Sequence, residues 1–494
     1  MTLLFSLLMG GLGNLASYLA AHVLLCLVPA FYIAGAMTAL IPKPAVTRFL
    51  GRSTPKGLSY PAAALAGSLL AVCSCTIVPL FAGIYRKGAG IGPALTFLFF
   101  APAANILALI YTGGVIGVDL ALARLVLGLA FGIGIGLLMA ALFRDADIAH
   151  DAATDSLFAG EPHLAGAAAL LFVVLIALLL VGTLKLDALA TPIAQVTIGI
   201  PFVGRVDTAL HQLVPFDATK GEEGLTSQGA ALILLLLITG LASWRGLEHI
   251  HQGFSRWTGV AAGLVVLTLV FAAVRVVPHV DSLDLIITPR TTGVAAALAA
   301  TILIAWRWLP RALLRDWLWE SWRFVKQIFP LLIAGVFAVG ILRMLIQPEW
   351  IETLAGTNSL LGNIAGVLFG VFMYFPTLVE VPIAKMLLGL GMHRGPLLAY
   401  LMADPELSLQ SILMITPILG RLRTWTYVGW VALFSALAGL VYGAWVDGAR
   451  LAMIALYITG FVALLACGFA ALERHRRAMR ARNPLPTPSI VREA

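Results

Sequence analysis

The chain has 494 residues, of which 60% are hydrophobic and only 11% are charged. Soluble domains carry about 25% charged residues, so this composition excludes an ordinary soluble protein and indicates an integral membrane protein. The net charge of +8 falls in short loops and in the C-terminal tail, a distribution typical of membrane topology rather than of nucleic-acid binding. We therefore expect an all-α polytopic protein whose partners are the lipid bilayer and a small molecule or ion, with homo-oligomers allowed.

Apolar runs near the roughly 20 residues that cross a bilayer recur along the chain, and about 12 to 13 transmembrane helices are expected. No cleavable signal peptide is evident. The basic tail favours a cytoplasmic C-terminus. In chain order the spans are expected at about 15–41, 59–85, 92–111, 118–143, 164–184, 228–244, 257–277, 292–309, 327–346, 360–388, 396–419, 425–445 and 451–471.

Two segments of the chain resemble each other at a fixed offset of 303 residues. Without a gap, residues 67–105 align with residues 370–408, and glycine and proline positions coincide. The coincident pairs are Gly67 with Gly370, Pro79 with Pro382, Gly88 with Gly391, Gly92 with Gly395, Pro93 with Pro396, and Pro102 with Pro405. This pattern predicts a duplicated hairpin of interrupted helices, at 59–111 and at 360–419.

The duplication divides the chain into four parts. Repeat 1 is expected at 15–184, an insert with a loop and about three additional spans at 185–326, repeat 2 at 327–471, and a basic, Pro-rich tail at 472–494. Transporters use both parallel and inverted repeats, and the span count in the insert leaves the two arrangements open.

Prolines interrupt the predicted hairpins. A proline inside a helix removes one backbone hydrogen bond, and in lipid the freed carbonyl must be satisfied by protein or must line a wet cavity. Matched interruptions in two halves indicate a transport site near the bilayer midplane. Ordinary kinks are the alternative. The expected helix breaks are at Pro79, Pro102, Pro376, Pro382 and Pro405.

Cys73 and Cys75 lie in the first hairpin. Thiolates favour soft metals and metalloids, which makes these two residues candidate metal or substrate ligands. Residues two apart point about 200° from each other on a regular helix, so they converge on one ion only where the helix is unwound. Packing as small hydrophobic side chains is the alternative.

The second hairpin carries charges where the first is apolar. Glu380, Lys385, Asp404 and Glu406 are expected in or near the membrane, where ionisable side chains are costly and mark functional sites. They are candidates for proton coupling or cation binding, and a structural ion pair is the alternative. Lys385 is expected to pair with Asp404 or Glu406.

A polar stripe is also expected in the second hairpin. Asp404, Ser408 and Ser411 share one face of a regular helix at i, i+4 and i+7. Asn105 is the counterpart of Ser408 in the first hairpin and extends the stripe across the repeat interface. The predicted substrate-binding residues are Cys73, Cys75, Asn105, Glu380, Asp404 and Ser408.

These motifs resemble the predicted-permease family that includes the organoarsenical efflux permeases. The resemblance rests on the run from Cys73-Ser-Cys75 through Pro79, Pro102 and Asn105, on MYFPTLVEVPIAK at 373–385, and on ADPELS at 403–408. It implies a bacterial or archaeal inner-membrane permease, with export of trivalent organoarsenicals or of metals. This chain departs from the family by carrying Thr76, where members often have glycine, and by a longer insert.

The combined prediction is a secondary permease that exports a soft metal, a metalloid or a small organic molecule. The site would lie between the two hairpins, Glu380 and Asp404 would couple transport to protons, and no cofactor is expected. No Walker A pattern is present, so the chain by itself is not a primary ATPase. A non-transporting subunit of a larger complex and a thiol-redox membrane component are the alternatives, and an enzyme is not expected.

Overall fold

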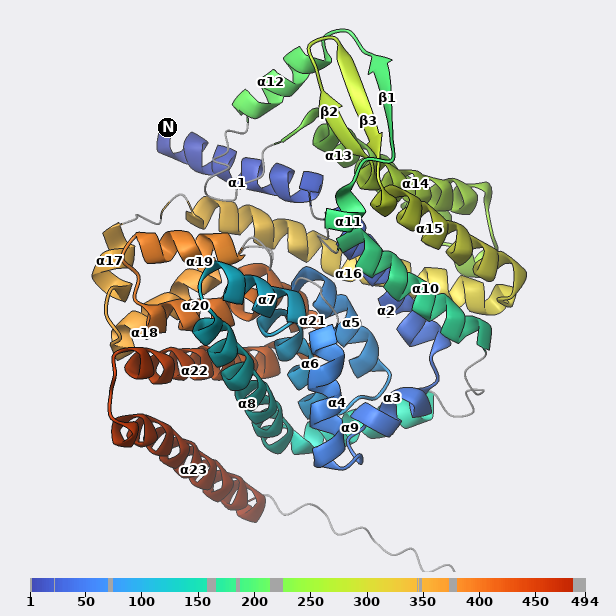
Figure 1. Ribbon diagram of the computed structural model, residues 1–494. Coiled ribbons are helices and arrows are strands. Elements are labelled where there is room, and N and C mark those ends of the chain that lie inside the picture. The colour runs from blue at the N-terminus through green and yellow to red at the C-terminus, as the bar shows by residue number, and fades with distance from the viewer. Residues whose placement is uncertain are drawn as a thin grey trace, which may run out of the picture.

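The computed structural model describes residues 2–21, 23–69, 74–157, 166–183, 187–213, 225–343, 345, 349–372 and 380–482. Helices make up almost all of it (Figure 1). Within these ranges, eight helices are long and apolar enough to cross a membrane, or nine if the bent pair Leu7–Ala20 and Leu24–Leu40 forms one span. The prediction of an all-α polytopic membrane protein is confirmed.

The first block of helices precedes the insert. Its elements are α1 (Thr2–Ala21), a π-helical turn (Val23–Leu27), α2 (Val28–Leu40), α3 (Lys43–Leu50), α4 (Lys56–Leu69), α5 (Ser74–Arg86), α6 (Ile91–Ala103), α7 (Ile106–Val115), α8 (Val118–Leu142), α9 (Arg144–Leu157) and α10 (Gly166–Thr183).

The insert holds three long apolar helices, close to the spans predicted there, and a small sheet that the sequence did not predict. Its elements are α11 (Asp187–Ala190), β1 (Ala194–Gly199), α12 (Val203–Leu213), α13 (Ser227–Leu247), a 3-10 turn (Ile250–Gln252), α14 (Arg256–Ala273), β2 (Arg275–Pro278), β3 (Ser282–Ile287) and α15 (Pro289–Arg307). The sheet is antiparallel with the order β1-β3-β2.

The last block contains the second hairpin. Its elements are α16 (Arg311–Arg343), α17 (Glu349–Ala355), α18 (Leu360–Phe372), α19 (Glu380–Gly389), α20 (Arg394–Leu407), α21 (Leu409–Leu419), α22 (Arg421–Val446) and α23 (Leu451–Arg482). The long helix α16 crosses the bundle, and α23 stands at its edge beside α22 (Figure 1).

Helices α4 to α8 and α18 to α22 correspond at the offset of 303 residues. Gly88 and Gly391, which end the two hairpins, have φ angles of +95° and +92°, a region that favours glycine. A Cβ on Gly136 would lie 2.7 Å from the carbonyl oxygen of Gly92, and one on Gly439 would lie 2.6 Å from that of Gly395. The same close helix contact therefore occurs in both halves, in agreement with the predicted duplication.

Two predicted spans, 59–85 and 360–388, do not cross the bundle as single helices. Each is a pair of short helices whose outer ends lie on the same side of the bundle. Two hydrogen bonds show this: Gly90 N donates to Leu50 O at 2.8 Å, and His393 N donates to Ala355 O at 2.9 Å. A helix of 14 residues such as α4 is about 21 Å long, shorter than the roughly 30 Å apolar core of a bilayer. This difference lowers the predicted span count.

The two hairpins open on opposite sides of the bundle. On one side, face A, Ile91 N donates to Asp147 at 2.9 Å, and α22 begins where Arg423 donates to Tyr85 at 3.3 Å. On the other side, face B, Arg394 donates to Asp119 at the start of α8 at 2.6 Å. The pair α6 and α7 therefore runs from face A to face B, and the pair α20 and α21 runs from face B to face A.

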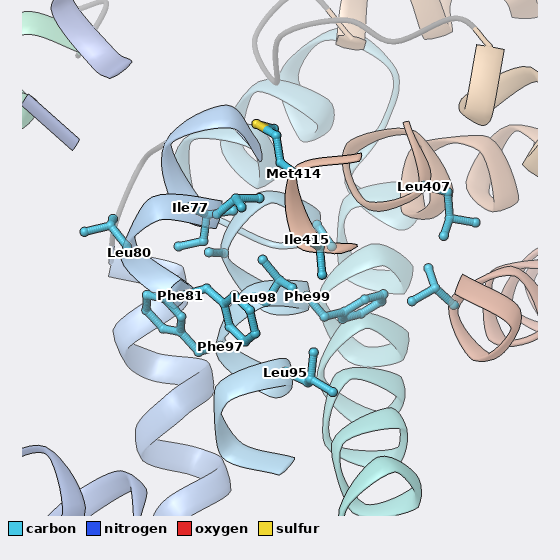
Figure 2. Packing of buried hydrophobic residues seen from close by; sticks show 14 of the residues in the cluster. Ile77, Leu80, Phe81, Leu95, Phe97, Leu98, Phe99, Leu407, Met414 and Ile415 are labelled. Atoms are coloured by element: carbon cyan, nitrogen blue, oxygen red, sulfur yellow. The ribbon is translucent and has the colours of Figure 1, made fainter. Parts of the chain in front are cut away.

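The apolar core extends between the two halves. Figure 2 shows Ile77 and Phe81 of α5 and Phe97 of α6 in one buried cluster with Met414 and Ile415 of α21, from the other half. All five side chains are at most 4% exposed. Inside a bilayer such side chains hold helices together by close van der Waals packing, so the halves form one packed unit.

Candidate functional site

The helix interruptions within the described residues lie beside the predicted prolines and not at them. Pro79 lies inside α5, Pro102 inside α6 and Pro405 inside α20, and Pro382 occupies the first turn of α19, where no helical N–H bond is lost. The chain leaves the helix after each half-membrane segment, at residues 104–105 and at 408. Pro376 lies outside the described residues. The segments directly before α5 and α19 lie outside the described residues, so the predicted breaks at Pro79 and Pro382 stay predictions.

Asn105 and Ser408 cap the second half of each broken helix. The Asn105 side chain accepts a bond from Ala108 N at 2.8 Å, and Ser408 Oγ accepts one from Ser411 N at 3.4 Å. An N-cap satisfies backbone N–H groups that a helix start leaves without partners. Since Ser408 lies between two helices, the predicted continuous stripe of Asp404, Ser408 and Ser411 is not a single helical face. Instead, Ser408 Oγ donates to Ser411 Oγ at 2.8 Å.

A buried ion pair joins the two halves. Arg124 Nη2 of α8 lies 2.6 Å from Glu380 Oε1 at the start of α19, and both side chains are 0% exposed. Arg124 Nε also donates to the carbonyl oxygen of Ala103 at 2.5 Å, and Nη1 donates to Thr112 at 3.4 Å. Helix ends favour this arrangement, because a cation suits the C-terminal end of α6 and an anion suits the N-terminal end of α19.

A second buried carboxylate lies at the other break. Glu406 is 2% exposed, and its Oε2 accepts a hydrogen bond of 2.6 Å from the hydroxyl of Tyr427, which is 0% exposed. Within the described residues, Glu406 Oε1 has no hydrogen-bond partner. Tyr427 is the counterpart of Arg124 at the offset of 303 residues, and Glu406 is the counterpart of Ala103. The contact of α8 with the end of α6 in the first half thus corresponds to the contact of α22 with the end of α20 in the second, with different side chains.

Asp404 is also buried, with 0% exposure. A Cβ on Gly370 would lie 2.8 Å from Asp404 N, so α18 packs tightly against α20 at this residue. The predicted pairing of Lys385 with Asp404 or Glu406 is wrong, because Lys385 is exposed whereas both acids are buried. The basic partner in this region is Arg124, which binds Glu380.

The sequence analysis did not identify Arg124 as a candidate site residue. It is the only basic residue in the apolar run 118–142, and the rule that intramembrane charges mark functional sites applies to it as much as to the second hairpin. A search for isolated charges in every span would have found it. Its partner is 256 residues away in the chain, and only the fold shows the pairing.

The structure does not describe the candidate thiol site. Cys73 lies outside the described residues. Cys75 is the second residue of α5, and its side chain is not described. In the described part of the chain, no three His, Cys, Asp or Glu side chains come together as a metal site. The roles of Cys73 and Cys75 stay predictions.

Comparison with known proteins identifies the family. A family model described as a predicted permease, ArsP_1, matches residues 8–444. The chain belongs to this permease family, and its function is that of a membrane transporter. This confirms the family resemblance seen in the hairpin motifs.

Two relatives share the sequence to different extents. UPF0718 protein MJ0584 from Methanocaldococcus jannaschii is 33% identical over 432 residues, which cover 87% of this chain and 94% of that protein. UPF0718 protein YraQ from Escherichia coli K12 is 29% identical over 118 residues, which cover 24% of this chain and 34% of that protein. No solved structure matches this chain.

Proposed function

We propose that this permease exports a soft metal or metalloid compound, or a small organic molecule of the organoarsenical class, by proton-coupled secondary transport. The substrate would bind between the hairpins α4–α5 and α18–α19, near the breaks after α6 and α20. The single observation that carries this proposal is the buried Arg124–Glu380 pair, because it places opposite charges from two oppositely directed halves at the helix breaks.

The proposed substrate ligands are the residues predicted from the sequence: Cys73, Cys75, Asn105, Glu380, Asp404 and Ser408. The thiols would contact a soft centre. Asn105 and Ser408 support the proposal by placing helix N-termini at the breaks, and Glu380 and Asp404 by supplying buried carboxylates.

We place face A in the cytoplasm of a plasma membrane. Cytoplasmic loops carry an excess of lysine and arginine. The α23 helix starts after face B and ends in the basic tail, which agrees with a cytoplasmic C-terminus. The basic residues that support this orientation are Lys43, Arg48, Arg52, Lys56, Arg86, Lys87, Arg144, Arg421 and Arg423.

The substrate test is a resistance and accumulation screen over arsenicals and metals in a deletion strain that expresses the permease. The double variant Cys73→Ser, Cys75→Ser is expected to lose resistance to the soft substrate by at least about tenfold, while its amount in the membrane stays unchanged. The matched control is Cys467→Ser, an exposed free cysteine on α23. Unchanged export by the double variant would rule out the thiol role.

Flux by the purified protein in liposomes separates transport by this chain from a non-transporting role in a larger complex. A pH gradient is expected to drive uptake or release of the substrate found in the screen. Glu380→Gln and Asp404→Asn are expected to abolish the proton-driven component. Coupling that persists in both variants would remove these two residues from the proton path.

A further inference from the structure

The two broken helices end in opposite electrostatic situations. At the end of α6, the guanidinium of Arg124 lies against the carbonyl oxygen of Ala103 at 2.5 Å. The C-terminal end of a helix carries partial negative charge, so a cation there is stabilising. The end of α20 holds an acid, Glu406, and the residue that corresponds to Arg124 is the uncharged Tyr427.

The charge of Glu406 therefore has no compensation from this chain among the described residues. Its Oε2 accepts the Tyr427 hydroxyl, Oε1 has no hydrogen-bond partner, and no ion pair involves it. The sequence of the hairpin segments that the structure does not describe, 70–73 and 373–379, contains no lysine, arginine or histidine. An ionised carboxylate buried without a cation is strongly unfavourable.

The neighbouring helices do not supply the missing cation. Of the helices packed against α20, α6, α18 and α21 contain no titratable side chain. Arg124 of α8 is paired with Glu380 of α19, and Asp119 of α8 binds Arg394 and Tyr442 at face B. Lys385 of α19 is exposed. The remaining titratable residues on α20 and α22 are Tyr400, Asp404, Arg421 and Arg423, and Arg423 reaches Tyr85 at face A.

We propose that the break between α20 and α21 binds an exchangeable monovalent cation, a proton or a sodium ion, which neutralises Glu406. Arg124 is its permanent, tethered counterpart at the break between α6 and α7. Asp404 lies two residues before Glu406 and so points about 200° away around α20, which leaves Glu406 as the group that the cation neutralises. This proposal adds a cation site to the proposed function. Only the link between this cation and transport rests on that function.

The test measures cation binding without any transport substrate. The full-length protein in nanodiscs is unfolded thermally at a series of pH values, in sodium chloride and in choline chloride of equal ionic strength. A ligand that binds the folded state raises the melting temperature. Sodium binding predicts a higher melting temperature in sodium chloride, and proton binding predicts a rise as the pH falls in both salts. Equal melting temperatures under all conditions would overturn the proposal.

Variants locate the effect. Glu406→Gln keeps an acceptor for the Tyr427 hydroxyl and is expected to lose the cation dependence. Glu349→Gln removes an exposed carboxylate on α17, outside the proposed site, and is expected to retain it. The opposite pattern would overturn the assignment to Glu406. If Glu406→Gln does not fold, Glu406→Asp takes its place. It is expected to shift the sodium or proton concentration that gives half of the rise in melting temperature by at least about tenfold. An unchanged midpoint would overturn the assignment to Glu406.

Because this measurement needs no substrate, its outcome is independent of the transport screen. Cation binding that depends on Glu406 without export of any tested compound would contradict the proposed substrate and leave the cation site in place. Export without cation binding at Glu406 would contradict the cation site and leave the proposed substrate in place.

Discussion

The helix breaks in the two halves share a backbone design and differ in their side chains. Both have a half-membrane hairpin, a broken helix with a capped second part, and a close glycine contact to the following helix. The first half places Ile77 and Ala103 where the second half places Glu380 and Glu406. The comparison indicates that glycine and capping positions maintain the shared architecture, while the charge at the breaks differs between the two halves.

The largest effect is expected from removing the ion pair that joins the two halves. Either Arg124→Gln or Glu380→Gln leaves the partner charge buried and is expected to destabilise the protein by about 3 to 5 kcal/mol. The double variant restores most of that loss, because no buried charge remains at the pair. Denaturation in mild detergent measures all three variants as a double-mutant cycle. Losses that simply add would contradict the direct pairing.

The shared architecture is tested at the matched glycines. Gly136→Ala and Gly439→Ala each bring a Cβ within 3.0 Å of a backbone carbonyl and are expected to cost about 1 to 3 kcal/mol, by similar amounts in the two halves. Gly429→Ala is the control on α22, since nothing lies within 4 Å of its Cβ position. A large loss in one half only would show that the two contacts are not equivalent.

Tyr427→Phe sharpens the comparison at the second break. It removes the donor to Glu406 Oε2 and keeps the ring, so a loss of about 1 to 3 kcal/mol is expected. Thermal unfolding in the same nanodiscs measures it, with the exposed Tyr111→Phe as control. An unchanged stability would mean that Glu406 does not depend on this hydroxyl.

The smallest effect is expected outside the two halves, in the sheet. Thr197, His279 and Gln195 donate to Asp284, and these bonds hold the pKa of Asp284 below its usual value. The stabilisation is therefore present above the ordinary pKa of an aspartate and is lost as the pH falls through the lowered one. Hydrogen exchange of the sheet amides should show this loss in the wild type and not in Asp284→Asn. Asp281→Asn is the control, and the same pH response in both variants would contradict the role of Asp284.

The sequence by itself determined the membrane class and the family, and it predicted the alignment of the two halves. Composition and apolar runs are local properties, and matched glycines such as Gly88 and Gly391 record backbone conformations that other residues avoid. The sequence also located the buried acids Glu380, Asp404 and Glu406, because charges stand out in apolar segments. It did not reveal the sheet, whose strand β1 pairs with β3 after three intervening helices.

Only the tertiary structure decided the direction of the hairpins and the partners of the buried acids. A run such as 59–85 has the length of one spanning helix, and its return to face A depends on the contact between Leu50 and Gly90. Arg124 and Glu380 meet although 256 residues separate them, and Tyr427 rather than Lys385 contacts Glu406. Pairings of this kind depend on how helices from distant parts of the chain pack, and no local pattern records that packing.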